Sequence, residues 1–200
     1  MATLRAVVEI GPEAVEGAAW PVEFADNYRW ETLNASTTPE TIGTVMAALA
    51  EWCRPEDAEP DATPTATEAL HWIAEADYLV IRAGIQLTDT TTGTTVNPGC
   101  CADLEDWRAW PHTWLGHDPT ACIEQAADGL LIHQEKTSQN PVKLPTGTLP
   151  ALLADLREDL IAFLAAAQTW ITTTTADPDL AAAVIATIDR HAAITAPLAD

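Results

Sequence analysis

Residues 150–167 read PALLADLREDLIAFLAAA and mark the point where the character of the chain changes. The apolar side chains recur there at the spacing of one helical face, namely Leu152, Leu153, Leu156, Leu160, Phe163, Leu164 and Ala167. This pattern predicts one long amphipathic helix over 151–170. The threonines at 172–175 should break that helix, and Pro178 should open a last helix over 178–193. We therefore expect a C-terminal helical pair within 150–193.

The residues before 150 contain short β-rich runs separated by turn residues. These runs predict strands at 4–10, 20–24, 78–82, 85–88, 94–96, 122–126, 130–135 and 142–144. Amphipathic helices are expected at 39–53 and 66–76, and a short helix at 104–110. Strands followed by helices are typical of an α+β fold. We predict a single α+β domain over residues 1–200, with helices packed on one face of a largely antiparallel sheet.

Local signals define the start and the end of the helix expected at 39–53. Thr38 suits the N-cap position, Pro39 suits the first helical position, and Glu40 complements the helix dipole. Residues 54–65 follow that helix and contain three prolines and four acidic residues. This composition predicts an exposed, acidic, proline-rich loop.

The charge balance restricts the classes of partner. The chain has 30 acidic and 9 basic side chains, for a formal net charge of −21. Such a surface repels nucleic-acid phosphates and anionic lipids, whereas it attracts a basic protein and accelerates their encounter. A charged residue interrupts the first apolar residues, and no uncharged apolar run is long enough for a membrane span. We therefore expect a cytoplasmic protein with no nucleic acid, membrane or cofactor bound.

One candidate partner-binding surface lies at residues 103–110. Asp103, Glu105 and Asp106 would supply negative charge, and Trp107 and Trp110 would supply aromatic anchors. The alternatives are a solvated acidic face and indoles packed in the core. Ala181, Ala182 and Ala183 in the last helix would also allow close helix approach, so a homodimer through the C-terminal helices is a further expectation.

A second candidate site is the cluster of Cys100, Cys101, His112, His117 and Cys122, because thiolates and imidazoles bind zinc. Zinc sites favour cysteines separated by two to four residues, and neighbouring cysteines are expected to point apart. The sequence therefore favours small buried thiols without a metal. A metal- or thiol-dependent enzyme centred on this cluster is kept as an alternative.

Residues 98–101, 104–108 and 114–119 read PGCC, LEDWR and WLGHDP and resemble a sequence block of an uncharacterised family of high-GC bacterial proteins. The helix from Leu149 is similar to theirs as well, and the resemblance implies no activity. In general type, a small acidic α+β protein also resembles immunity proteins that neutralise basic toxins. The leading hypothesis is thus a non-enzymatic, immunity- or antitoxin-like protein that binds a basic partner. A small-molecule binder with a Trp-lined pocket is the remaining alternative.

Overall fold

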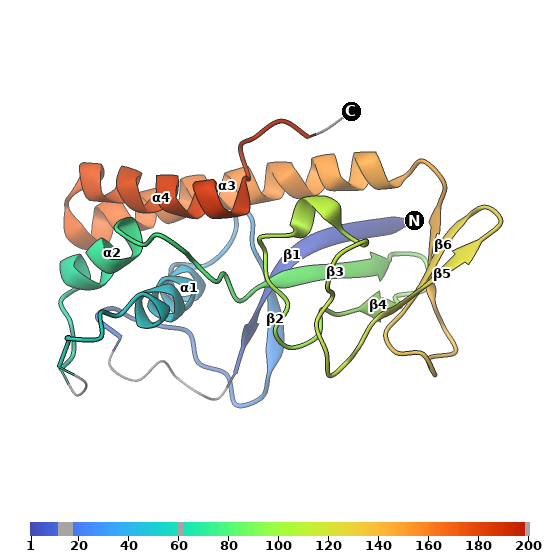
Figure 1. Ribbon diagram of the computed structural model, residues 1–200, viewed down its shortest axis with the longest axis horizontal. Coiled ribbons are helices and arrows are strands. Elements are labelled where there is room, and N and C mark those ends of the chain that lie inside the picture. The colour runs from blue at the N-terminus through green and yellow to red at the C-terminus, as the bar shows by residue number, and fades with distance from the viewer. Residues whose placement is uncertain (12–17, 60–61, 199–200) are drawn as a thin grey trace.

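The computed structural model describes residues 1–11, 18–59 and 62–198 (Figure 1). In chain order its elements are β1 (Ala2–Ile10), β2 (Arg29–Thr32), α1 (Pro39–Trp52), α2 (Ala66–Ala74), β3 (Gly84–Asp89), β4 (Thr95–Val96), the 3-10 helix η1 (Trp107–Ala109), β5 (Cys122–Ala126), β6 (Gly129–His133), β7 (Val142–Pro145), α3 (Leu149–Thr175) and α4 (Pro178–Ala192). The predicted α+β class is confirmed. The assignment of residues 1–200 to a single domain stays a prediction.

The strands form two antiparallel sheets instead of one. The first has the order β2-β1-β3-β4, and the second has the order β5-β6-β7. In the first sheet Leu4 of β1 stands opposite Leu87 of β3, and both side chains are buried. Contacts of β7 with β1 and β3 join the two sheets. Side chains alternate between the faces of a strand, so this register places an apolar face under the helices.

The helices cover one face of the first sheet. α3 packs on β1 and on α4, and α4 also packs on α2 (Figure 1). Leu156, Leu160 and Ala167 of α3 are completely buried, as the spacing of its apolar residues predicts. Burying a leucine stabilises the fold by about 1.5–3 kcal/mol, so this stripe holds the helix on the sheet. The predicted C-terminal helical pair is confirmed.

The predicted break at 172–175 is wrong, because α3 continues to Thr175. Each of the four threonine hydroxyls donates a hydrogen bond to the carbonyl four residues earlier, from Gln168 to Ile171. These side chains therefore satisfy acceptors of the helix itself and do not compete with its backbone. The helix ends at Ala176, which adopts a left-handed conformation with φ 55°.

Two predicted strands, 20–24 and 78–82, are extended segments without strand pairing. Some of their apolar residues nevertheless belong to the core, although Phe24 and Tyr78 are each 55% exposed. Trp20 donates to the carbonyl of Gly43 and packs edge-on against Trp170, with ring centroids 5.2 Å apart. Leu79 and Ile81 are likewise buried. The partner of β1 is instead β2, whose side chains are all partly exposed.

The segment after α4 is held by two arginines. Arg108 donates to the carbonyl oxygens of Ala193, Ala196 and Pro197, and Arg157 of α3 donates to those of residues 194–196. In α4 itself, Ala181 is buried inside the protein. Ala182 and Ala183 are exposed, and the homodimer stays a prediction.

The helix starts and the acidic loop follow the local signals of the sequence. Thr38 caps α1 by accepting a hydrogen bond from the backbone N–H of Thr41, as predicted. The described residues of 54–65 form no helix or strand and are mostly exposed. Pro60 and Asp61 of this predicted loop lie outside the described residues, as does Pro12, which follows β1. No helix in the described ranges is both long and apolar enough to cross a membrane.

Candidate functional site

The connection between β4 and β5 folds back on itself and brings Cys100 beside His117. The two residues form an isolated antiparallel bridge, in which Cys100 N donates to His117 O at 2.6 Å and His117 N donates to Cys100 O at 3.0 Å. The N–H of Gly99 donates to the carbonyl of Leu115 at 2.9 Å. Three backbone hydrogen bonds thus fix the relative position of the two segments.

Two glycines allow these segments to approach so closely. A Cβ atom at Gly99 would lie 2.4 Å from Pro119 O and 2.6 Å from both His117 N and His117 O. Gly116 has φ +86°, and a Cβ atom there would lie 2.5 Å from Gly99 O. Because these neighbours are backbone atoms, a side chain at Gly99 cannot be accommodated without separating the segments.

The bridge places three candidate metal ligands together. Cys100 Sγ lies 2.7 Å from His117 Nδ1, and one ligand atom from each of Cys100, Cys101 and His117 lies within 4.8 Å of the others. All three residues are exposed. The expectation that the neighbouring cysteines point apart and are buried is therefore wrong. Cys101 has φ 62°, so the chain turns between the two residues and does not continue as an extended strand.

His112 and Cys122 do not complete this set. Within the described ranges, the only group of three or more candidate ligands is the Cys100–Cys101–His117 cluster. His112 is exposed in the turn after η1, and its N–H donates to the carbonyl of Ala109. Cys122 is half-buried in β5, where it stands opposite His133. The structure thus brings together three of the five residues that the sequence singles out.

The surroundings of Cys100 do not favour the thiolate form of its side chain. Loss of hydration raises its pKa above the usual value, and a hydrogen bond with Cys101 and the charge of Asp118 act in the same direction. A nucleophilic cysteine needs the opposite shift, because the thiolate is the reactive form. Metal binding needs the thiolate as well, so this shift does not distinguish ligand binding from thiol catalysis.

A cleft of about 450 Å³ borders the two thiols. Its volume falls within the range of about 300–1,000 Å³ that is typical of small-molecule sites. The lining comes from β1, β2, the end of α1, the extended segment 80–83 and the loop 98–102. Its polar, sulfur-containing and aromatic members are Glu9, Trp30, Trp52, Arg82, Cys100 and Cys101.

The predicted aromatic anchors lie elsewhere. Trp107 and Trp110 are 1% and 4% exposed and belong to the core. The indole N–H of Trp107 donates to the carbonyl of Ala192 at 2.8 Å, and Arg108 stacks over the same ring. These contacts attach η1 to the end of α4. The structure thus corrects the proposed role of the two indoles, since neither presents a face to a partner, and the core-packing alternative describes their positions.

The three predicted acidic residues differ in their surroundings. Asp103 is half-buried, and burial raises the pKa of its carboxyl group although it accepts a hydrogen bond from the N–H of Glu105. Glu105 and Asp106 are exposed. The hydroxyl of exposed Tyr78 lies 3.5 Å from a carboxylate oxygen of Glu105, and the charge of Glu105 is the main cause that raises the pKa of that phenol.

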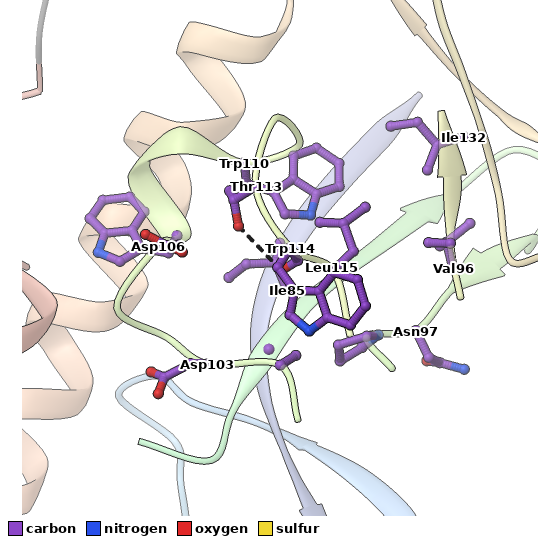
Figure 2. A pocket seen from close by; sticks show the side chains of 15 residues that line it. Ile85, Val96, Asn97, Asp103, Asp106, Trp110, Thr113, Trp114, Leu115 and Ile132 are labelled. Atoms are coloured by element: carbon purple, nitrogen blue, oxygen red, sulfur yellow. Dashed lines mark hydrogen bonds between the residues drawn. The ribbon is translucent and has the colours of Figure 1, made fainter. Parts of the chain in front are cut away.

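The tryptophans of the β4–β5 connection also line a separate small cavity. Figure 2 shows Trp110, Trp114 and Leu115 around it, together with Ile85, Val96 and Ile132 from the strands. The volume of this cavity is about 20 Å³, which is enough for one water molecule. This cavity therefore does not provide the ligand-sized, Trp-lined pocket expected from the sequence. The indole of Trp114 is 62% exposed, and its centroid lies 6.3 Å from that of the His117 ring.

Sequence reasoning missed the residues that line the larger cleft. Glu9, Trp30, Trp52 and Arg82 lie far apart in the chain, and each is an isolated residue within an ordinary element or loop. No local motif marks them, because only the pairing of β1 with β2 and the path of 78–83 bring them together. No family model, curated protein or solved structure matches this chain.

Proposed function

We propose that Cys100, Cys101 and His117 form an open binding centre for a soft divalent metal ion, with Zn²⁺ as the ion of choice. The observation that carries this proposal is the convergence of two sulfur atoms and one imidazole nitrogen within 4.8 Å of one another at the edge of a cleft. This arrangement supports the metal-binding part of the alternative stated from the sequence, which was a metal- or thiol-dependent enzyme centred on this cluster.

The donor set and its spacing suit zinc. Zinc binds thiolate sulfur at about 2.3 Å and imidazole nitrogen at about 2.0–2.1 Å in tetrahedral geometry. The bridge fixes the relative position of the backbones that carry Cys100 and His117, and the three ligand atoms lie within 4.8 Å of one another. Three protein ligands leave one position for water or a substrate atom, which is typical of catalytic zinc sites. The cleft then gives that fourth position access to a small molecule.

The test is a titration of the reduced full-length chain with Zn²⁺, with Co²⁺ as a spectroscopic reporter of thiolate ligation. We expect one equivalent of tightly bound metal. The variants C100S, C101S and H117A should each lose more than the ~10–100-fold in affinity that outer-shell changes cost.

C122S is the matched control, because it removes a thiol that lies outside the cluster, and it should bind metal as the unaltered protein does. Circular dichroism verifies that each variant is folded. The proposal is wrong if the unaltered protein binds no stoichiometric metal, or if C122S weakens binding as much as C101S does.

A second proposal keeps the acidic surface as a docking site for a basic protein partner, in an immunity- or antitoxin-like role. It is supported by the exposure of Glu105 and Asp106 beside one another, with the hydroxyl of exposed Tyr78 3.5 Å from the Glu105 carboxylate. Exposed Glu105 and Asp106 would attract the partner, and the rate of association would depend on ionic strength.

The test uses a basic partner recovered from the neighbouring genes. Its association rate should fall between low and physiological salt and should fall further in the double variant E105Q/D106N. A rate that responds neither to salt nor to these substitutions would exclude this role.

A further inference from the structure

The cleft beside the cysteines contains an arginine for which no described residue is a partner. Arg82 lines the cleft and is exposed, and it makes no hydrogen bond or ion pair with any residue in the described ranges. The other arginines all make such contacts: Arg5, Arg29, Arg54, Arg108, Arg157 and Arg190. Arg82 is thus the one arginine whose guanidinium group has no partner among the residues that the structure describes.

The carboxylate that lines the same cleft does not pair with Arg82. Glu9 lines the same cleft but forms no ion pair with Arg82, so their charged groups lie more than 4.0 Å apart. A guanidinium group offers a planar fork of N–H donors that matches a carboxylate. The N–H donors of Arg82 are therefore free, within the described ranges, to bind an anionic group that enters from solvent.

The walls of the cleft supply flat apolar surface. Trp30 of β2 is half-buried, and Trp52 at the end of α1 is 49% exposed. Indole faces bind planar apolar groups well, because aromatic pairs gain about 0.5–1.5 kcal/mol beyond area burial. A ligand that uses both walls and Arg82 has a ring and an acidic group, and a cleft of about 450 Å³ holds a molecule of that size.

We infer that this cleft binds a small aromatic monocarboxylate, with its carboxylate on Arg82 and its ring against Trp30 and Trp52. A single positive charge faces the ligand, and Glu9 would repel a second negative charge, so a phosphate or a dicarboxylate fits less well. The inference goes beyond the metal centre, because Arg82 and the two indoles need no metal ion to bind this ligand.

The experiment measures 3-phenylpropionate binding to the reduced, metal-free full-length chain by calorimetry. Its amide and phenylsuccinate serve as the uncharged and the doubly charged comparison ligands. R82Q should weaken 3-phenylpropionate binding at least about tenfold, as expected for loss of a charge-assisted hydrogen bond, and should leave amide binding unchanged. W52A should weaken both ligands.

K136Q is the matched control. Lys136 is exposed, lies outside the cleft and has no partner among the described residues, and K136Q removes one positive charge, as R82Q does. The inference is overturned if the amide binds as tightly as the acid, if phenylsuccinate binds more tightly, or if K136Q weakens binding as much as R82Q. Zinc uptake by the same preparation is measured separately. If the protein binds zinc but not 3-phenylpropionate, the carboxylate site is refuted and the metal centre is not. If it binds 3-phenylpropionate but not zinc, only the metal centre is refuted.

Discussion

Replacing Gly99 by alanine should destabilise the protein and separate the proposed metal ligands. The new Cβ atom would lie 2.4–2.6 Å from three backbone atoms of Pro119 and His117, and no side-chain rotation can relieve these contacts. Overpacking of this kind costs about 1–3 kcal/mol. Separation of the segments also weakens the two hydrogen bonds between Cys100 and His117, each with a net value of about 1 kcal/mol.

We therefore expect G99A to lower the free energy of unfolding by about 2–4 kcal/mol. With a typical denaturant dependence, the urea midpoint should fall by about 1–2 M without a change in m value. Zinc affinity should fall as well, because the imidazole and the sulfur of Cys100 lose their common backbone support.

The matched control is G93A. Gly93 has φ +75°, and no atom lies within 4 Å of the place that a Cβ atom would take there. Alanine at this position therefore adds conformational strain of about 1–2 kcal/mol and no steric contact. G93A lies in the β3–β4 turn and should leave zinc uptake unchanged. The reasoning fails if G99A is no more destabilising than G93A, or if G99A unfolds earlier but retains full zinc affinity.

Three further predictions concern the fold and its titrating groups. T38A removes the N-cap acceptor for the N–H of Thr41, and urea unfolding should show a loss of about 1 kcal/mol, whereas an unchanged midpoint would refute the cap. Burial raises the pKa of Cys53 to about 11, so mass spectrometry should detect its alkylation by iodoacetamide only as the pH approaches that value, and fast modification at pH 8 would contradict this. The hydrogen bond from Lys143 lowers the pKa of Asp128, so K143Q should raise that pKa toward 3.8 in an NMR titration. The stabilisation from this pair is present above the pKa of the unfolded chain and is lost as the pH falls through the folded value, and an unmoved pKa in K143Q would exclude the pairing.

Elements with local signals could be predicted from the sequence, and elements defined by tertiary contacts could not. Thr38 and Pro39 give the start of α1 because capping is a local interaction. The segments 20–24 and 78–82 have strand-like composition, but β1 pairs with β2 and β3 and leaves no edge for them. β2 itself is a short edge strand without a buried side, so its sequence carries little alternation.

The candidate site shows the same division. The chemistry of Cys100, Cys101 and His117 could be recognised from residue types, and the structure selects these three from the predicted five. Their convergence could not be recognised, because it depends on the left-handed conformation of Cys101 and on the close approach at Gly99. Arg82 carries no signal in the sequence, since its significance lies in the lack of an ion pair or hydrogen bond with any residue in the described ranges.

The arginines that hold the segment after α4 have a consequence for the behaviour of the whole molecule in solution. Arg108 is bound by peptide carbonyls of residues 193–197, and Arg157 and Arg190 bind carbonyls as well. Arg108 and Arg190 thus bind neutral backbone and form no ion pair with a carboxylate in the described ranges, whereas Arg157 also lies 3.6 Å from the Glu158 carboxylate. Copies of the chain therefore repel one another strongly in dilute buffer. Added salt screens this repulsion between molecules. It leaves the hydrogen bonds from the arginines to backbone carbonyls largely intact, because these are short-range contacts with neutral groups.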